Sequence, residues 1–489
     1  MRFVALAASF DGTLAREGRY DERCIDALRA LAATGRKLIL VTARELRELL
    51  EIFPSARVFD YIIAENGAIL HEPATKQSEI LAQAPSEMLL RELSRRGIAP
   101  LTVGSSIITT PLANEGAVRD AIDQLRLDCH LVTNDGRLIV LPADVSKASG
   151  VEEVLRQLGV SAQNLVVIGD AQNDVALFRL AEHAVAVQNA DAAIKAYADR
   201  TTVGAYCEGF LELARDLMEG DLAYAQPKRR VVLGTLVDGR ELTLAPYYDS
   251  LLICGPRGSG KAALCDEVFE QLSANGYQCC VIGAAADRRT HGTHVAPGLR
   301  VYGDVTEAPR LTEVIAALEH PTTSVTLNLA ALPIESRAVF AEALLVQLQA
   351  LHDRAGRPHT IIIQDAQGLL QGAAVPGSAT RLSEMTRVYV TVDADRLRPE
   401  LLEDVVTVIA LGDARVPSQF DEFGSTSSML LRSGPEGSSR HARAWVRSER
   451  LLSRSSAQAI AEDAECGSSR SCESGAASVP SDEVSSLSG

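Results

Sequence analysis

Charged and hydroxyl side chains follow the apolar, strand-like runs in the first half of this sequence. These side chains are Ser9, Asp11, Thr42, Lys147, Asp170, Asn173 and Asp174. A lysine, hydroxyl groups and carboxylates that hold a divalent cation can together stabilise the negative charge of a transferring phosphoryl group. Residues of these types at the ends of strands are compatible with phosphoryl chemistry, although each of them alone is more often a helix cap or a surface residue.

Predicted strands and helices alternate around these side chains, which is the pattern of an α/β fold. The predicted strands lie at residues 3–10, 37–41, 59–68 and 164–168, and the predicted helices at residues 21–33, 150–158 and 208–217. Parallel strands bring their carboxyl ends to one edge of a sheet, so we expect the polar side chains to meet there in a doubly wound sheet. Residues 82–145 instead predict a small α+β insertion with antiparallel strands.

Four short motifs occur in the order used by the haloacid dehalogenase (HAD) phosphatases. They are residues 9–13 (Ser-Phe-Asp-Gly-Thr), Thr42, Lys147 and residues 169–174 (Gly-Asp-Ala-Gln-Asn-Asp). Residues 41–44 and 64–68, together with the insertion, are similar to the Cof-like type IIB subgroup. The resemblance covers about residues 1–218. It implies a Rossmann-like core over residues 1–81 and 146–219 and a cap over residues 82–145.

The resemblance also implies roles for individual residues. Asp11 would be the general acid/base, and Thr42 and Lys147 would hold the phosphate of a small phosphorylated metabolite. Mg²⁺ would be bound by carboxylate and amide oxygens of Asp11, Asp170, Asn173 and Asp174.

Ser9 occupies the position at which these phosphatases carry the nucleophilic aspartate. An ionised carboxylate attacks phosphorus and binds Mg²⁺, whereas a serine hydroxyl needs a base and is a weak metal ligand. Two interpretations stay open. The chain is either an impaired Mg²⁺-dependent phosphatase, or a catalytically inactive two-domain binding or regulatory protein, a pseudoenzyme, for phosphate ligands or nucleotide.

A second set of α/β signals begins after a predicted linker at residues 220–230. The strand at residues 251–254 leads into Gly255-Pro256-Arg257-Gly258-Ser259-Gly260-Lys261 and then a helix, which is the context of a P-loop. The nucleotide-binding residues expected from this motif are Gly255, Gly258, Ser259, Gly260, Lys261, Ala262 and Asp365.

Two positions of this second motif set are altered. Ala262 replaces the usual serine or threonine, and Gln364-Asp365 replaces an acidic pair. Residues 230–415 resemble the FtsK/HerA-like ATPases, which implies an ATPase-like domain over residues 231–452 and ATP or ADP as ligand. Because both metal-holding positions differ, binding is favoured over hydrolysis, and a plain glycine-rich turn stays an alternative.

Composition restricts the partners and the compartment. The formal charge of −16 disfavours nucleic acid as the main partner, and no apolar run is long enough to cross a bilayer. We therefore expect a cytoplasmic protein with its nine scattered cysteines reduced. The serine-rich residues 453–489 predict a disordered tail.

Overall fold

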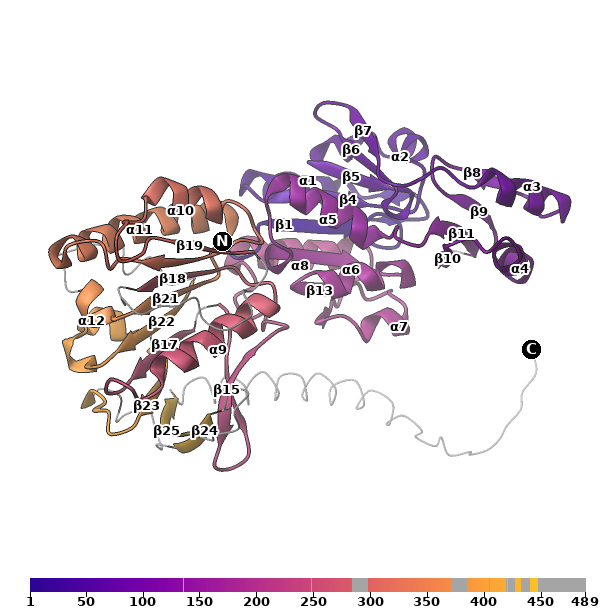
Figure 1. The fold of residues 1–489 in the computed structure, drawn as a ribbon. Coiled ribbons are helices and arrows are strands. Elements are labelled where there is room, and N and C mark those ends of the chain that lie inside the picture. Colours follow the sequence, from indigo (N-terminus) through magenta and orange to yellow (C-terminus); the bar gives the residue numbers. More distant parts are fainter. Residues whose placement is uncertain are drawn as a thin grey trace, which may run out of the picture.

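Two α/β lobes lie side by side in the computed structural model of this chain (Figure 1). The structure describes residues 1–134, 136–247, 249–283, 298–370, 385–403, 405–418, 420, 427–431 and 440–446. The predicted disordered tail at residues 453–489 lies outside this part of the chain. In the described part, no helix is long and apolar enough to cross a membrane.

The first lobe is built on an 8-stranded sheet with the order β14-β13-β12-β1-β4-β5-β6-β7. The parallel strands at its centre are fully buried apolar runs, as sheets covered on both faces require. The strands are β1 (Ala5–Ser9), β4 (Lys37–Val41), β5 (Tyr61–Ala64), β6 (Ile69–Glu72), β7 (Gln77–Ile80), β12 (Leu165–Gly169), β13 (His183–Ala186) and β14 (Arg200–Thr201). A separate two-stranded ribbon is formed by β2 (Ala15–Arg16) and β3 (Arg19–Tyr20).

Helices follow most of these strands and pack on the sheet. They are α1 (Glu22–Ala33), α2 (Leu46–Ile52), α5 (Lys147–Leu158), α6 (Val175–Leu180), α7 (Ala192–Lys195) and α8 (Cys207–Gly220). The register joins Ala5 of β1 to Leu165 of β12 on one side and to Lys37 of β4 on the other. The predicted Rossmann-type fold of the first half is thereby confirmed.

The insertion forms a 4-stranded antiparallel sheet with the order β10-β11-β9-β8. Its strands are β8 (Thr102–Val103), β9 (Ile108–Pro111), β10 (Cys129–Asn134) and β11 (Arg137–Pro142). Helices α3 (Glu87–Arg95) and α4 (Glu115–Leu125) bury a small apolar core of their own against it. This cap lies at the end of the first lobe that is farther from the second lobe (Figure 1).

The second lobe contains an 11-stranded mixed sheet with the order β16-β15-β24-β25-β23-β17-β22-β21-β18-β20-β19. Its parallel part comprises β17 (Ser250–Cys254), β18 (Cys279–Gly283), β19 (Leu299–Tyr302), β20 (Ser324–Asn328), β21 (Thr360–Gln364), β22 (Thr386–Thr391) and β23 (Val405–Leu411). The antiparallel strands are β15 (Val231–Leu236), β16 (Glu241–Leu244), β24 (Ser427–Leu431) and β25 (Arg440–Val446).

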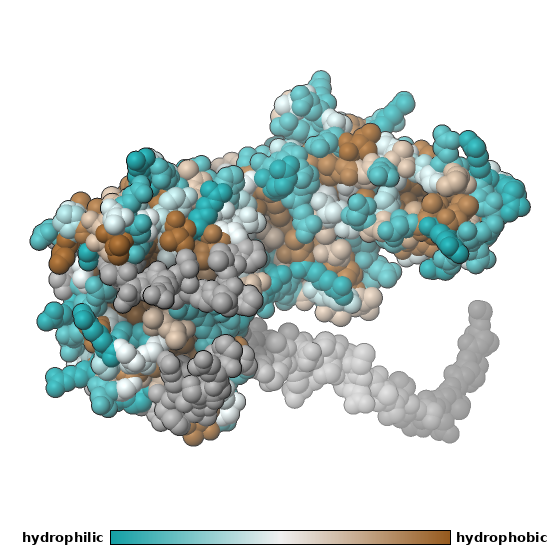
Figure 2. Space-filling model, viewed as in Figure 1, coloured by the Kyte–Doolittle hydropathy of each residue, from teal (hydrophilic) through white to brown (hydrophobic). Residues whose placement is uncertain are grey.

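The described helices of the second lobe are mostly crossover connections between its parallel strands. They are α9 (Lys261–Ala274), α10 (Leu311–Leu318), α11 (Ile334–Ala355), α12 (Ala366–Leu369) and α13 (Pro399–Leu402). Apolar side chains reach the surface in scattered patches rather than one continuous face (Figure 2), and those of α11 are Ile334, Val339 and Val346.

The two lobes meet through the residues that precede their parallel strands. Asn164, before β12, donates from Nδ2 to the Gly356 carbonyl oxygen at 3.1 Å, and its Oδ1 lies 3.1 Å from Nε2 of His359, before β21. Tyr277, before β18, donates to the Glu182 carboxylate at 2.9 Å. Because the amino ends of both sheets are joined, their carboxyl ends are directed away from the junction.

The predicted linker is partly packed against the first lobe. Leu222 is fully buried, and the Arg2 guanidinium donates to the Ala225 carbonyl oxygen at 2.7 Å. The division into domains at residues 220–230 stays a prediction.

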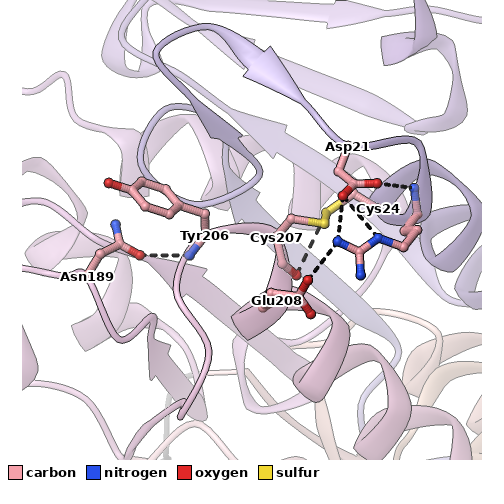
Figure 3. Close-up of a disulfide and its surroundings, with 7 residues drawn as sticks. Asp21, Cys24, Asn189, Tyr206, Cys207 and Glu208 are labelled. Carbon is pink, nitrogen blue, oxygen red and sulfur yellow. Dashed lines mark hydrogen bonds and ion pairs between the residues drawn. A yellow bond between two sulfur atoms is a disulfide. The ribbon is translucent and has the colours of Figure 1, made fainter.

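One expectation about the cysteines is wrong. Cys24 of α1 and Cys207, the first residue of α8, form a disulfide (Figure 3) although 183 positions separate them. Packing of α1 against α8 brings the two residues together, and a pairing between such distant residues has no signal in local spacing. The described cysteines that are not part of a disulfide are Cys129, Cys254, Cys265, Cys279 and Cys280.

Candidate functional site

The carboxyl end of the first sheet gathers side chains from four separate loops. Lys147 Nζ lies 2.7 Å from Asp174 Oδ1 and 3.2 Å from Ser9 Oγ. Lys147 is the first residue of α5, and Ser146 before it caps the helix by accepting a hydrogen bond from the Ser149 amide. The cap fixes the direction in which the lysine leaves the helix.

Asp174 is completely buried and each of its carboxylate oxygens has a partner. Oδ1 receives the Lys147 ammonium, and Oδ2 accepts the backbone N–H groups of Asp170 and Ala171 at 3.1 and 3.2 Å. Asp170 lies beside this pair and accepts a hydrogen bond from Thr13 Oγ1 at 2.9 Å. Burial, followed by the neighbouring charge of Asp174, raises the pKa of Asp170 to about 7.

Gly12 allows the motif loop to approach Asp170 closely. Its φ of +76° is in the left-handed region, and a methyl group added there would lie 1.8 Å from Asp170 Oδ2. The Gly12 carbonyl oxygen accepts a hydrogen bond from Asn189 Nδ2 at 2.8 Å, and Asn189 Oδ1 accepts the Tyr206 amide at 2.7 Å. Since Tyr206 precedes Cys207, these contacts connect the motif loop to the disulfide-bonded end of α8 (Figure 3).

Asp11 is held by a residue to which the sequence analysis gave no role. Arg44 donates to both carboxylate oxygens of Asp11, from Nε and from Nη2, each at 2.8 Å, and also pairs with Glu48. The hydrogen bonds to Asp11 are the main cause of the raised pKa of Arg44. Arg44 lies two positions after Thr42 in the quoted motif, so its position at the carboxyl end of the sheet could have been predicted from the sequence. Its pairing with Asp11 could not.

The turn after β5 joins the site to the cap. Glu65, whose side chain is buried, accepts the backbone N–H groups of Ser105 and Ser106, each at 3.2 Å, through its carboxylate. Asn66 accepts a hydrogen bond from Asn173 Nδ2 at 3.0 Å. The sequence analysis gave Glu65 and Asn66 no individual role, although it quoted the turn.

Most of the side chains predicted for the first site are inaccessible in this arrangement. Ser9 and Lys147 are 3% exposed and Thr42 is 1% exposed, whereas Asp11 is only partly buried. The structure brings Ser9 and Asp174 together through Lys147, whose ammonium donates to both of them. It directs Asp11 toward Arg44.

Comparison with known proteins finds relatives of this part of the chain. The family model described as haloacid dehalogenase-like hydrolase matches residues 6–94 and 116–212. A phosphoglycolate phosphatase of Halobacterium salinarum is 30% identical over 216 residues, which cover 42% of this chain and 93% of that protein. The chain belongs to the haloacid dehalogenase-like hydrolase family. A phosphoglycolate phosphatase of Methanothermobacter thermautotrophicus is 27% identical over 224 residues, which cover 44% of this chain and 98% of that protein.

A solved HAD-like hydrolase from Bacteroides thetaiotaomicron is also similar, with 17% identity, a TM-score of 0.40, and coverage of 44% of this chain and 99% of its own. Both comparisons with relatives concern the first lobe of this HAD-family chain.

HAD phosphotransferases typically use Mg²⁺. The donors of this chain do not fit a metal site of usual strength, because Ser9 supplies a neutral hydroxyl, Asp11 is paired with Arg44, and both oxygens of Asp174 have partners. Within the described ranges, no three His, Cys, Asp or Glu residues are grouped so that they could hold a metal ion. Of the four predicted metal ligands, Asp170 and Asn173 keep an oxygen that is not hydrogen-bonded in the described structure.

The second lobe places its predicted loop at the corresponding sheet edge. Residues 255–260 connect β17 to α9, and Gly258 and Gly260 have φ values of +78° and +97°. Lys261 Nζ donates to the carbonyl oxygens of Gly255 and Pro256 at 2.6 and 2.8 Å, so the lysine is bound by its own loop. Burial is the main cause of the lowered pKa of Lys261. Ala262 is exposed on the first turn of α9.

Asp365 follows β21 and begins α12 in the left-handed conformation, with φ +55°. Its carboxylate accepts a hydrogen bond from Gln367, which in turn accepts one from Thr391 Oγ1 at 2.5 Å at the end of β22. The loop, Asp365 and Thr391 therefore lie at the carboxyl ends of three adjacent parallel strands.

Proposed function

We propose that the first lobe binds a small phosphorylated metabolite at Ser9, Thr42 and Lys147 and hydrolyses it far more slowly than a HAD phosphatase with an aspartate nucleophile. The observation that carries this proposal is the contact between Ser9 and Lys147 at the end of β1. The cation, the threonine hydroxyl and the loop that would hold a phosphate are kept, whereas the attacking carboxylate is absent.

Among the described residues, the side-chain hydrogen-bond partner of Ser9 Oγ is Lys147 Nζ, which donates to it and is no base for its hydroxyl. The same ammonium is buried in an ion pair with the Asp174 carboxylate at 2.7 Å. Asp11, the proposed acid/base, is held by Arg44 and would have to leave that ion pair to reach a leaving group. Hydrolysis by a serine nucleophile is therefore disfavoured at two steps.

The names of the relatives support one substrate to try first. Both are called phosphoglycolate phosphatases, and phosphoglycolate is a small phosphate monoester of the proposed class. We propose that the cap selects the organic part of the ligand, because Glu65 links the cap loop to the turn beside the site.

Calorimetric titration of the full chain with phosphoglycolate, sugar phosphates and inorganic phosphate tests binding. Steady-state assays with and without Mg²⁺ test turnover on the same compounds. Binding that is lost in Lys147→Met, combined with turnover far below ~1 s⁻¹, agrees with the proposal, since ordinary enzymes turn over at about 1–10³ s⁻¹. Wild-type turnover in that range would contradict it.

Nucleotide binding by the second lobe is a second candidate function. The specific observation in its favour is that the glycine-rich loop, Asp365 and Thr391 lie at the carboxyl ends of three neighbouring parallel strands, the edge at which α/β sheets bind ligands. We propose a P-loop domain of the FtsK/HerA-like type over residues 231–452 that binds ATP or ADP through backbone amides and Lys261, with little hydrolysis. Loss of ATP binding in Lys261→Ala would agree with this assignment.

A further inference from the structure

The described part of the second lobe contains a groove of about 900 Å³ to which no role has been given. It is lined by charged side chains and an indole, among them Asp395, Asp413, Arg415, Arg443 and Trp445. Its size is within the range of small-molecule binding sites. The groove has polar groups that a nucleoside could use, whereas the Trp445 ring is buried beneath the Arg443 guanidinium.

The groove adjoins the glycine-rich loop. A methyl group placed on Gly412, which lines the groove, would lie 3.7 Å from Cγ of Pro256 in the loop. A methyl group added at Gly255 would lie 2.8 Å from the Leu411 carbonyl oxygen. The contacts follow from strand pairing, because β23 lies beside β17 with Ala410 opposite Cys254.

The charges of the groove and of the loop also act on a common neighbour. Burial raises the pKa of Cys254 to about 11, and the positive charges of Arg443 and Lys261 both oppose this shift. Both cations therefore lie close enough to the end of β17 to act on Cys254. An elongated anion with its phosphates at the loop could extend from there into the groove.

We propose that the groove binds the base and ribose of a nucleotide whose phosphates lie on residues 255–261. The proposal rests on the second candidate function. Arg415 is exposed and has no hydrogen-bond or ion-pair partner among the described residues, so its planar guanidinium can stack on a base. The exposed carboxylate of Asp413 can accept hydrogen bonds from ribose hydroxyls.

Calorimetric titration of the full chain with ATP and with tripolyphosphate, which has no nucleoside, tests the groove. ATP should bind about tenfold more tightly than tripolyphosphate, because stacking of one base on a protein side chain contributes about 1–3 kcal/mol. Arg415→Ala should bring the ratio of the two affinities close to one, because it weakens the binding of ATP and leaves the binding of tripolyphosphate unchanged. Arg300→Ala, the same charge change on an exposed residue of the far edge strand β19, should leave the ratio unchanged.

A second measurement tests the ribose contact. Asp413→Asn should weaken ATP about threefold to tenfold and leave 2′,3′-dideoxy-ATP unaffected, since that compound lacks the hydroxyl groups. Equal affinity of ATP and tripolyphosphate, or an equal loss of both in Arg415→Ala, would overturn the groove but leave phosphate binding by the loop intact. No binding of either compound would overturn the nucleotide function together with the groove.

Discussion

The carboxyl ends of the two parallel sheets hold their polar groups in different ways. At the first, Lys147 and Asp174 form an ion pair that is 3% and 0% exposed, with Asp170 and Ser9 packed around it. At the second, the hydrogen bonds of Lys261 within the described residues go to carbonyl oxygens of its own loop, and the lysine is partly exposed. Each edge lacks one group that the resemblance to an enzyme family leads us to expect. The first has Ser9 where an aspartate is expected, and the second has Ala262 where a serine or threonine hydroxyl is expected.

The different burial of the two lysines indicates why the residues of a site can be kept after its catalytic activity is lost. If one residue of a buried ion pair is lost, the charge of the other stays buried without a partner and strongly destabilises the folded state. Folding therefore requires that both residues of the pair are kept. An exposed glycine-rich loop has no such dependence. The first edge can therefore stay intact without turnover, whereas the second depends on ligand binding alone.

The largest expected effect is the return of turnover in Ser9→Asp. A carboxylate at this position supplies both the nucleophile and a metal ligand, and it would lie beside Lys147, whose Nζ is 3.2 Å from the present hydroxyl. We expect phosphoglycolate hydrolysis to rise on the order of a thousandfold, about 4 kcal/mol in the barrier, and to require Mg²⁺. Steady-state kinetics with MgCl₂ or EDTA measures both.

Ser9→Ala is the matched control for this gain. It removes the hydroxyl without adding a charge, so its rate should equal the background of the wild type. If Ser9→Asp and Ser9→Ala hydrolyse phosphoglycolate at the same rate, the missing carboxylate is not what limits turnover. The ion pair between Asp11 and Arg44 is then the next contact to test.

Substituting the two lysines tests the comparison directly. Lys147→Met leaves Asp174 buried without a counter-ion, which should lower the free energy of unfolding by about 3–5 kcal/mol. Lys261→Met removes hydrogen bonds to two neutral carbonyl oxygens of the loop and leaves no buried charge unpaired, so it should change stability by less than about 1 kcal/mol. Urea titrations of the full chain give both values, and equal losses would disprove the contrast between the edges.

A pH-dependent contrast is expected at the amino ends of the two sheets. Burial lowers the pKa of His183 to about 4, and neither ring nitrogen has a hydrogen-bond partner in the described structure. The unfolded chain takes up a proton near pH 6.5 and the folded chain does not, so stability falls as the pH decreases through this window. The loss from this residue is about 2 kcal/mol between pH 8 and pH 5.

His183→Phe should therefore raise stability at pH 5 relative to the wild type and have little effect at pH 8. Burial also lowers the pKa of His359, but both nitrogens of this ring are within hydrogen-bond distance of partners, the Gln278 amide and Asn164 Oδ1. His359→Phe should lower stability at both pH values. Thermal melts at the two pH values distinguish the variants, and a gain at pH 8 for His183→Phe would show that packing, not titration, is responsible.

The smallest expected effect is on the metal dependence of the second edge. Ala262→Thr restores a hydroxyl on the exposed first turn of α9, where it could ligate a nucleotide-bound Mg²⁺. We expect Mg²⁺ to strengthen ATP binding about fivefold in this variant and to have almost no effect in the wild type, roughly 1 kcal/mol by calorimetry. A strong Mg²⁺ effect in the wild type would mean that other oxygens already hold the ion.

Short-range patterns in the sequence were enough to predict the fold of the first lobe. Apolar runs such as residues 37–41 can only be buried strands in a parallel sheet, and β4 has those bounds. The helix predicted at residues 150–158 begins three residues earlier, at Lys147, and the capping Ser146 before it explains why α5 begins there. Such features depend on neighbouring residues, so the order of residues determines them.

Only the tertiary structure decided which groups face each other. Arg44 with Asp11 and Glu65 with the cap amides join side chains to partners on other loops or strands, and Cys24 with Cys207 joins residues 183 positions apart. These pairings depend on how helices and strands pack, which no local periodicity encodes. The groove beside residues 255–261 has the same origin, because chain packing places β23 and β25 beside β17.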